Sequence, residues 1–238
     1  MSRKKTKFII FGQSRSGSTL LKSLLNSHKD ILCEGELFNP DDGYVSNKWA
    51  LKFYRHYPEL LVNYRRLKAK EKVYGFTLFL YHFGNIESYL KRSIEKGWKV
   101  IHLYRENIFR QALSNVIAME TGFWHRHKDH KSPDYKVHID AHKLVAELEK
   151  RIRWHRFEDE LFERIDHIKI NYENDLANHE KRDISLNGLL DFLNVEPCRL
   201  TSDLVKTDTR PPEEIIVNYN ELMENLKNTA LKYLIPKE

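Results

Sequence analysis

Cysteine is scarce in this sequence, and long apolar runs are missing from it. The two cysteines, Cys33 and Cys198, provide no disulfide framework and do not have the spacing of zinc ligands. No segment approaches the roughly 18 consecutive apolar residues of a membrane-spanning helix, and the apolar run at residues 8–11 is too short for a signal peptide. We therefore expect no stable membrane insertion and a cytoplasmic location.

The sequence also contains no internal repeat and no low-complexity tract. With 238 residues, 41% of them hydrophobic and 12% aromatic, the chain is long enough for one α/β domain, which we expect to span residues 1–238. The formal net charge of +6 suits an anionic ligand, nucleic acid included. Because the 40 basic residues are interspersed with 34 acids, a mixed solvated surface without a nucleic-acid partner is favoured.

A glycine-containing loop near the N-terminus lacks the lysine that nucleotide-hydrolysing loops carry. In FGQSRSGSTLL, residues 11–21, Gly12 is followed by four residues and then by Gly17 and Ser18. A Walker-type loop has Lys at the position of Ser18, where its ammonium group reaches the β- and γ-phosphates. No apolar run ends in an aspartate that would place a magnesium ligand nearby, so a metal-free phosphate ligand is favoured. Its candidate ligands are the backbone amides of residues 15–19, the Arg15 side chain, and the hydroxyl groups of Ser16, Ser18 and Thr19.

The hydrophobic pattern alternates between strand and helix periods along the chain, and the loop joins a strand to a helix. This order predicts an α/β fold, a three-layer sandwich with a central parallel β-sheet and helices on both faces. Ligands of such sheets bind at the carboxyl ends of the strands, where both the loop and Arg105 fall. The predicted strands are residues 7–11, 73–80, 99–104 and 167–172, and the predicted helices are residues 18–27, 48–72 with a break near Pro58, 86–96, 107–120, 142–165, 184–193 and part of 212–234.

Two polar segments have more than one interpretation. The basic and aromatic segment at residues 48–72 could bind nucleic acid through stacking and phosphate contacts, but a scaffold or the wall of an acceptor cleft is favoured. The segment at residues 122–140 contains His125, His127 and His130 among Lys and Arg residues, which repel a cation. We expect no metal there and interpret the segment as a solvated or acceptor-binding loop.

Two segments of the chain resemble a known enzyme family. GQSRSGSTLL, residues 12–21, resembles the 5′-phosphosulfate loop of sulfotransferases that use 3′-phosphoadenosine-5′-phosphosulfate (PAPS), and VIHLYRENIFRQALS, residues 100–114, resembles their 3′-phosphate site. Weaker similarities follow in the family's order: CEGELFNP at 33–40, INYENDL at 170–176 and RPPEEIIVNYNEL at 210–222. The resemblance implies a P-loop nucleotide-binding-like sulfotransferase fold and transfer of a sulfuryl group from PAPS to an acceptor hydroxyl. The product would be adenosine 3′,5′-bisphosphate, and no metal would take part.

The resemblance also implies which residues bind the cofactor. Arg15, with the loop amides, would stabilise the charge that develops on the leaving phosphate. Arg105 and Ser114 would hold the 3′-phosphate, and Arg110 is a rival ligand because the spacing from Arg105 to Ser114 is one position longer than in many members. The implied cofactor-binding residues are Gln13, Ser14, Arg15, Ser16, Gly17, Ser18, Thr19, Arg105 and Ser114.

The family further implies a catalytic base and an acceptor. Glu34 is the first candidate for the base that takes the proton of the acceptor hydroxyl, Glu36 is the second, and His82 and His102 are alternatives. The acceptor would be a hydroxyl-bearing small molecule, carbohydrate or lipid, with a carbohydrate or glycolipid favoured. Two other functions stay open: a small-molecule or nucleotide kinase with a variant phosphate loop, and a non-catalytic protein that binds nucleic acid with steep salt dependence.

Overall fold

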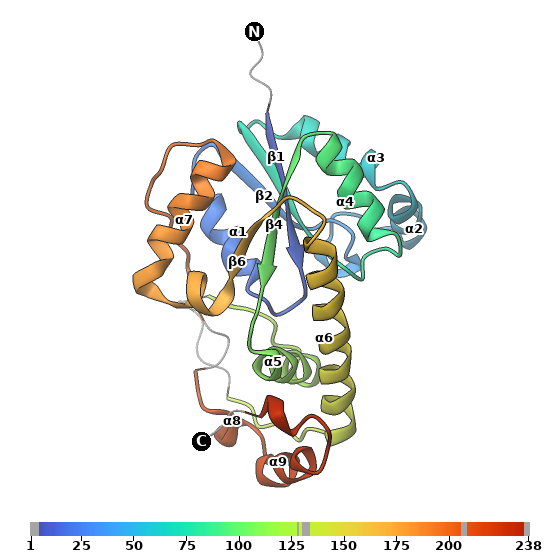
Figure 1. Cartoon of the computed structure of the whole chain (residues 1–238), viewed down its shortest axis with the longest axis vertical. Coiled ribbons are helices and arrows are strands. Elements are labelled where there is room, and N and C mark those ends of the chain that lie inside the picture. The colour runs from blue at the N-terminus through green and yellow to red at the C-terminus, as the bar shows by residue number, and fades with distance from the viewer. Residues whose placement is uncertain (1–4, 128, 130–133, 206–208, 236–238) are drawn as a thin grey trace. The chain divides into compact units, whose positions relative to one another are not determined.

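The computed structural model of the chain describes residues 5–127, 129, 134–205 and 209–235 (Figure 1). Contacts within the chain group it into two compact units. The first unit combines Met1–Tyr104 with Glu160–Ser202, and the second combines Arg105–Asp159 with Asp203–Glu238. Each unit has a hydrophobic cluster of its own. The expectation of a single domain over residues 1–238 stays a prediction.

A five-stranded parallel sheet forms the centre of the first unit, which confirms the α/β fold predicted from the sequence. The strand order is β2-β3-β1-β4-β6, and every neighbouring pair is parallel. Residues 8–11 of the central strand β1 are fully buried, as expected for a parallel strand that is covered on both faces. The strands are β1 (Thr6–Gly12), β2 (Ile31–Glu36), β3 (Val73–Phe79), β4 (Trp98–Tyr104) and β6 (Ile168–Asn171).

The sequence does not predict strand β2. Its residues, ILCEGE, include two glutamates and a glycine, which are uncommon in strands. Within the described sheet β2 pairs only with β3, at the edge of the order. Tertiary pairing with β3 therefore determines this strand, because the intrinsic preference of its residues does not.

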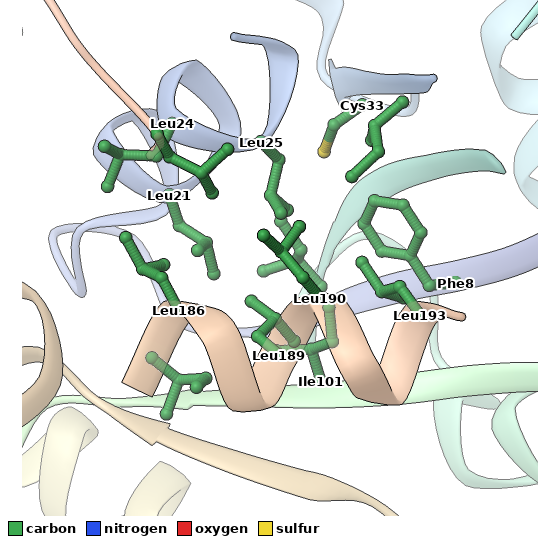
Figure 2. Close-up of a cluster of buried hydrophobic side chains, with 14 of the residues drawn as sticks. Phe8, Leu21, Leu24, Leu25, Cys33, Ile101, Leu186, Leu189, Leu190 and Leu193 are labelled. Carbon is green, nitrogen blue, oxygen red and sulfur yellow. The ribbon is translucent and has the colours of Figure 1, made fainter. Parts of the chain in front are cut away.

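Helices α1 (Ser18–Asn26) and α7 (His179–Leu193) cover one face of this sheet. In Figure 2 the leucines of α1, among them Leu21 and Leu25, lie opposite Leu186 and Leu190 of α7, above Phe8 of β1. Helix α7 begins at His179 instead of residue 184, because the Asn178 side chain accepts hydrogen bonds from the first backbone N–H groups of the helix.

The opposite face of the sheet is rich in aromatic side chains. Trp98 of β4 packs edge-on against Tyr74 and Phe76 of β3, and Phe11 of β1 packs against Phe162, the last residue of α6 (Ala141–Phe162). On this side lie α4 (Ile86–Glu95) and the hairpin of α2 (Lys48–His56) and α3 (Pro58–Lys68), which break at Pro58 as predicted (Figure 1). Helices on both faces of the sheet confirm the three-layer arrangement.

The second unit is built mainly from helices. Its hydrophobic cluster joins α5 (Ile108–Thr121) and the N-terminal part of α6 to α8 (Pro212–Ile215) and α9 (Tyr219–Lys227). In the same unit the fully buried guanidinium of Arg151 binds Glu147, which also accepts a hydrogen bond from Asn115.

The segment at residues 122–140, predicted as a loop, contributes the short strand β5 (Arg126–His127), which pairs with β7 (Leu204–Val205). Among the described residues, no helix is both long and apolar enough to cross a membrane.

We expect Gly75→Ala to destabilise the first unit. A Cβ atom at position 75 would overlap the ring of Phe8, which is fully buried under α1 and α7 and has no room to move. The free energy of unfolding should fall by about 1–3 kcal/mol, as for other overpacked cores. Urea denaturation followed by circular dichroism would measure this change.

Gly188→Ala is the matched control for this substitution. Gly188 lies exposed within α7, and a Cβ atom there meets nothing within 4 Å. Alanine should raise the free energy of unfolding by about 0.5–1 kcal/mol, because it has the higher helix propensity. Equal effects of the two substitutions would contradict the packing described for Gly75.

Candidate functional site

The loop after β1 leaves the sheet at its carboxyl edge and enters α1. Gly12, the last residue of β1, has no room for a side chain, because a Cβ atom there would overlap the carbonyl oxygen of Leu103 on β4. The buried residues Gln13 and Ser16 follow, and the Ser16 hydroxyl donates a 2.7 Å hydrogen bond to the carbonyl oxygen of Gln13. The loop is therefore tightly folded against the end of the sheet, between the strand and the helix that the sequence predicts for it.

Two residues of this loop have left-handed backbone conformations. Arg15 has a φ of 64° and Gly17 a φ of 95°. A left-handed conformation is uncommon for an arginine and costs energy, and such residues cluster at functional sites. Alternation of right- and left-handed residues can gather backbone N–H groups into an anion-binding concavity. The two left-handed residues are therefore compatible with anion binding by the loop backbone.

Gly17 is also the N-cap of α1, and it contributes no side chain to cap the helix. A Cβ atom at this position would lie 2.5 Å from the ring of Tyr172, which begins the helical turn Tyr172–Ala177 after β6. The Tyr172 ring therefore covers the glycine and fixes the start of the helix. Because helix N-termini carry partial positive charge, this end of α1 favours an anion.

Glu34 on β2 is buried and tightly bound. Its carboxylate accepts hydrogen bonds from the Arg65 guanidinium of α3, with Nε 2.8 Å from Oε1, and from the Tyr74 hydroxyl at 2.5 Å. Only 7% of its side chain is exposed. The bond to Glu34 raises the pKa of Arg65, and burial together with the same carboxylate raises the pKa of Tyr74. These contacts link β2 to β3 and α3 through the Glu34 carboxylate.

A β-bulge at Gly35 separates Glu34 from Glu36. Glu34 pairs with Phe76 and Glu36 with the next residue of β3, so Gly35 is the extra residue of the bulge. Its N–H group donates to the Tyr44 hydroxyl at 2.7 Å, and the N–H group of Glu36 donates to the Asp42 carboxylate at 2.9 Å. Bulges of this kind redirect side chains and are frequent beside active sites.

Glu36 ends β2 and contacts His82. The Nε2 atom of His82 lies 3.3 Å from the Glu36 carboxylate, and Nδ1 of His82 accepts the backbone N–H of Phe79 at 3.1 Å. Because Nδ1 is an acceptor, the neutral ring carries its proton on Nε2 and donates it to Glu36. The Glu36 side chain is 22% exposed, three times as much as that of Glu34. Of the two glutamates, Glu36 is thus the one with access to solvent at the carboxyl edge.

The predicted 3′-phosphate residues belong to the second unit. Arg105 is its first residue in sequence, and Ser114 lies half-buried on α5. Arg110 is exposed near the start of the same helix, where its N–H group donates to the Asn107 side chain that caps α5. The loop and both glutamates belong to the first unit.

The other histidines considered from the sequence are the alternative base His102 and the histidines of the segment at residues 122–140. His102 is buried in β4, where its ring stacks on Phe162 with 3.9 Å between centroids. His125 is exposed, and His130 lies outside the described residues. Within the described residues, no three His, Cys, Asp or Glu side chains are grouped so that they could hold a metal ion.

The sequence did not reveal the hydrogen-bond partners that give Glu34 and Glu36 different surroundings. Arg65 and Tyr74 lie far from Glu34 in the sequence, and nothing in their own segments indicates a shared ion pair. The bonds of Asp42 and Tyr44 to the bulge likewise depend on the fold. A glycine inside a strand pattern indicates a bulge, but the sequence does not predict this strand, so the glycine between the two glutamates could not be interpreted in that way.

Comparisons with known proteins agree with this arrangement. Residues 7–88 match the model of the sulfotransferase family. The chain is 26% identical over 220 residues to nodulation protein H of Rhizobium tropici, an alignment that covers 90% of this chain and 87% of that protein. A sulfotransferase from Alicyclobacillus acidocaldarius has a similar fold, with a TM-score of 0.51, 15% identity and coverage of 96% of each chain.

The predicted resemblance to the sulfotransferase family is thereby confirmed. The matched segment contains the loop, Glu34, Glu36 and His82. It does not reach Arg105 or Ser114.

We expect Glu34→Gln to lower the stability of the protein and Glu36→Gln to change it much less. The first substitution removes the charge that pairs with Arg65 at a buried position, whereas Glu36 is partly solvated. Loss of a largely buried charged hydrogen bond should lower the free energy of unfolding by about 1–3 kcal/mol. Urea denaturation of both variants measures the difference, and a larger loss in Glu36→Gln would contradict the contacts described here.

Proposed function

We propose that the protein transfers a sulfuryl group from PAPS to a hydroxyl group of a carbohydrate or glycolipid. The observation that carries the proposal is the lysine-free loop between β1 and α1. Its left-handed residues Arg15 and Gly17 lie at the carboxyl edge of the parallel sheet, beside the N-terminus of a helix. Backbone amides and a helix terminus at this place favour a phosphate or phosphosulfate group.

In this proposal the chain binds both phosphates of the cofactor. PAPS supplies an activated sulfuryl group, and the residues that fit its 5′-phosphosulfate are Gln13, Ser14, Arg15, Ser16, Gly17, Ser18 and Thr19. The Arg15 guanidinium stabilises negative charge at the leaving phosphate. Arg105 and Ser114 hold the 3′-phosphate, which distinguishes PAPS from ATP, and support for this role comes from the sequence resemblance of residues 100–114.

Glu36 is the base in this proposal, and His82 positions it. The Glu36 carboxylate is partly exposed at the carboxyl edge, and His82 donates a hydrogen bond to it. Both nitrogens of the His82 ring are engaged, one by the Phe79 N–H group and the other by Oε2 of Glu36. The histidine therefore holds the carboxylate in place, and the other carboxylate oxygen is left to accept the proton of the acceptor hydroxyl. Glu34 instead holds Arg65 and Tyr74.

We expect Glu36→Gln to lower kcat by about 10²–10⁴-fold, the usual contribution of a positioned base. Glu34→Gln should keep kcat within about tenfold of the unmodified protein at a temperature where it is folded. The assay measures formation of the labelled sulfate ester when the labelled sulfuryl group of PAPS is transferred to each of a panel of sugar and glycolipid acceptors. A larger loss of kcat in Glu34→Gln than in Glu36→Gln would indicate that Glu34 is the base. If no hydroxyl acceptor in the panel receives the sulfuryl group, the proposed reaction is contradicted.

A further inference from the structure

Helices α2 and α3 expose an unusual number of large apolar side chains. The described residues include thirteen exposed large hydrophobic side chains, and six of them lie between residues 48 and 68. Isolated exposed apolar side chains are normal, but a concentration of them marks an interaction site. The exposed residues of these two helices, together with Tyr57 between them, are called the α2–α3 surface. Its apolar members are Trp49, Phe53, Tyr57, Leu60, Tyr64 and Leu67.

On α2 an aromatic row and a basic row run side by side. Trp49 and Phe53 are one helical turn apart, and the Phe53 ring meets Tyr57 with 5.1 Å between centroids. The neighbouring positions 48, 52 and 56 carry Lys, Lys and His, and all of them are exposed. Leu51, on the other side of the helix, is the residue of α2 that packs into the protein.

Helix α3 also exposes apolar and basic side chains next to each other. Leu60, Tyr64 and Leu67 are spaced at i, i+4 and i+7 and therefore share one exposed face, while Leu61 and Val62 are buried. The Nζ atom of Lys68 lies 4.4 Å above the Tyr64 ring. The exposed face of each helix thus combines apolar side chains with cations.

The charge of the α2–α3 surface is positive. Glu59 is the one acid in the sequence from residue 48 to residue 68, and its carboxylate lies 3.6 Å from Arg92 of α4. Two of the three arginines point into the protein, Arg55 to the carbonyl oxygen of Phe38 and Arg65 to Glu34, and the third, Arg66, is half-buried. Lys48, Lys52 and Lys68 therefore give the surface its outward charge.

We propose that the α2–α3 surface binds the surface of an anionic lipid bilayer. Trp and Tyr favour the headgroup region, leucine and phenylalanine favour the acyl boundary, and lysines attract anionic lipids. A second copy of the chain would place lysines against lysines across a symmetric contact, which is unfavourable. Nucleic acid would leave Leu60 and Leu67 without a partner suited to them, because aliphatic side chains do not stack on bases. The binding is independent of the proposed sulfuryl transfer.

Vesicle co-sedimentation of the full chain tests this proposal. Vesicles of phosphatidylcholine alone are compared with vesicles that contain equal amounts of phosphatidylcholine and phosphatidylglycerol, at low and high salt. We expect binding to the anionic vesicles only, weakened by salt. Lys48→Gln with Lys52→Gln should weaken binding at least about tenfold, since each lysine near such a surface contributes on the order of fivefold. Trp49→Ala with Phe53→Ala should weaken it by about tenfold or more.

Control variants lie on α7 of the same unit. Ile184→Ala and Lys181→Gln remove an exposed apolar side chain and an exposed cation there, and they should leave vesicle binding unchanged. Circular dichroism verifies that every variant is folded. In the unmodified protein, tryptophan emission should shift to shorter wavelength with anionic vesicles, and Trp49→Phe should remove the shift while retaining most of the binding.

Three results would overturn the proposal. The first is absence of binding to the anionic vesicles, or binding that the α2 variants leave unchanged. The second is that the protein binds single-stranded oligonucleotides but not vesicles, and that the lysine and aromatic variants abolish the oligonucleotide binding. The third is a dimer in light scattering that the Trp49→Ala, Phe53→Ala variant converts to a monomer.

Discussion

The turn between β1 and α1 has space for backbone but not for side chains at its two ends. Gly12 is closed in by the carbonyl oxygen of Leu103 and Gly17 by the ring of Tyr172. These contacts come from β4 and from the turn after β6, so the parallel sheet itself determines where helix α1 begins. The cluster of leucines between α1 and α7 holds the helix in that place. The position of Arg15 and of the helix N-terminus depends on all of these contacts.

A second constraint acts at the edge of the same sheet. Gly35 inserts one extra residue into β2, and the N–H groups of the bulge donate to Tyr44 and Asp42 instead of to a neighbouring strand. Burial raises the pKa of Asp42, although its hydrogen bond with the backbone of Glu36 acts in the opposite direction. The bulge gives two glutamates of one short strand different surroundings. One carboxylate is buried in an ion pair, and the other is partly exposed beside a histidine.

Periodicity and turn residues sufficed to predict most of the fold. Strands β1, β3, β4 and β6 and helix α1 have the residue patterns of their elements, and the strand–loop–helix order located the glycine-containing loop. Strand β2 could not be predicted, because pairing with β3 outweighs the preferences of its glutamates and glycine. The partners of Glu34 could not be predicted either, because the pair of Glu34 with Arg65 joins positions that only the folded chain brings together.

The central claim is that the β1–α1 loop holds a PAPS-type nucleotide, and binding calorimetry in EDTA tests it most directly. The account predicts micromolar binding of adenosine 3′,5′-bisphosphate without metal, weak binding of ATP, and weaker bisphosphate binding in Arg15→Gly, which removes the cation but suits the φ of 64°. If the protein does not bind the bisphosphate, and binds ATP only after magnesium is added, the claim is contradicted. That result would indicate a kinase with a variant loop.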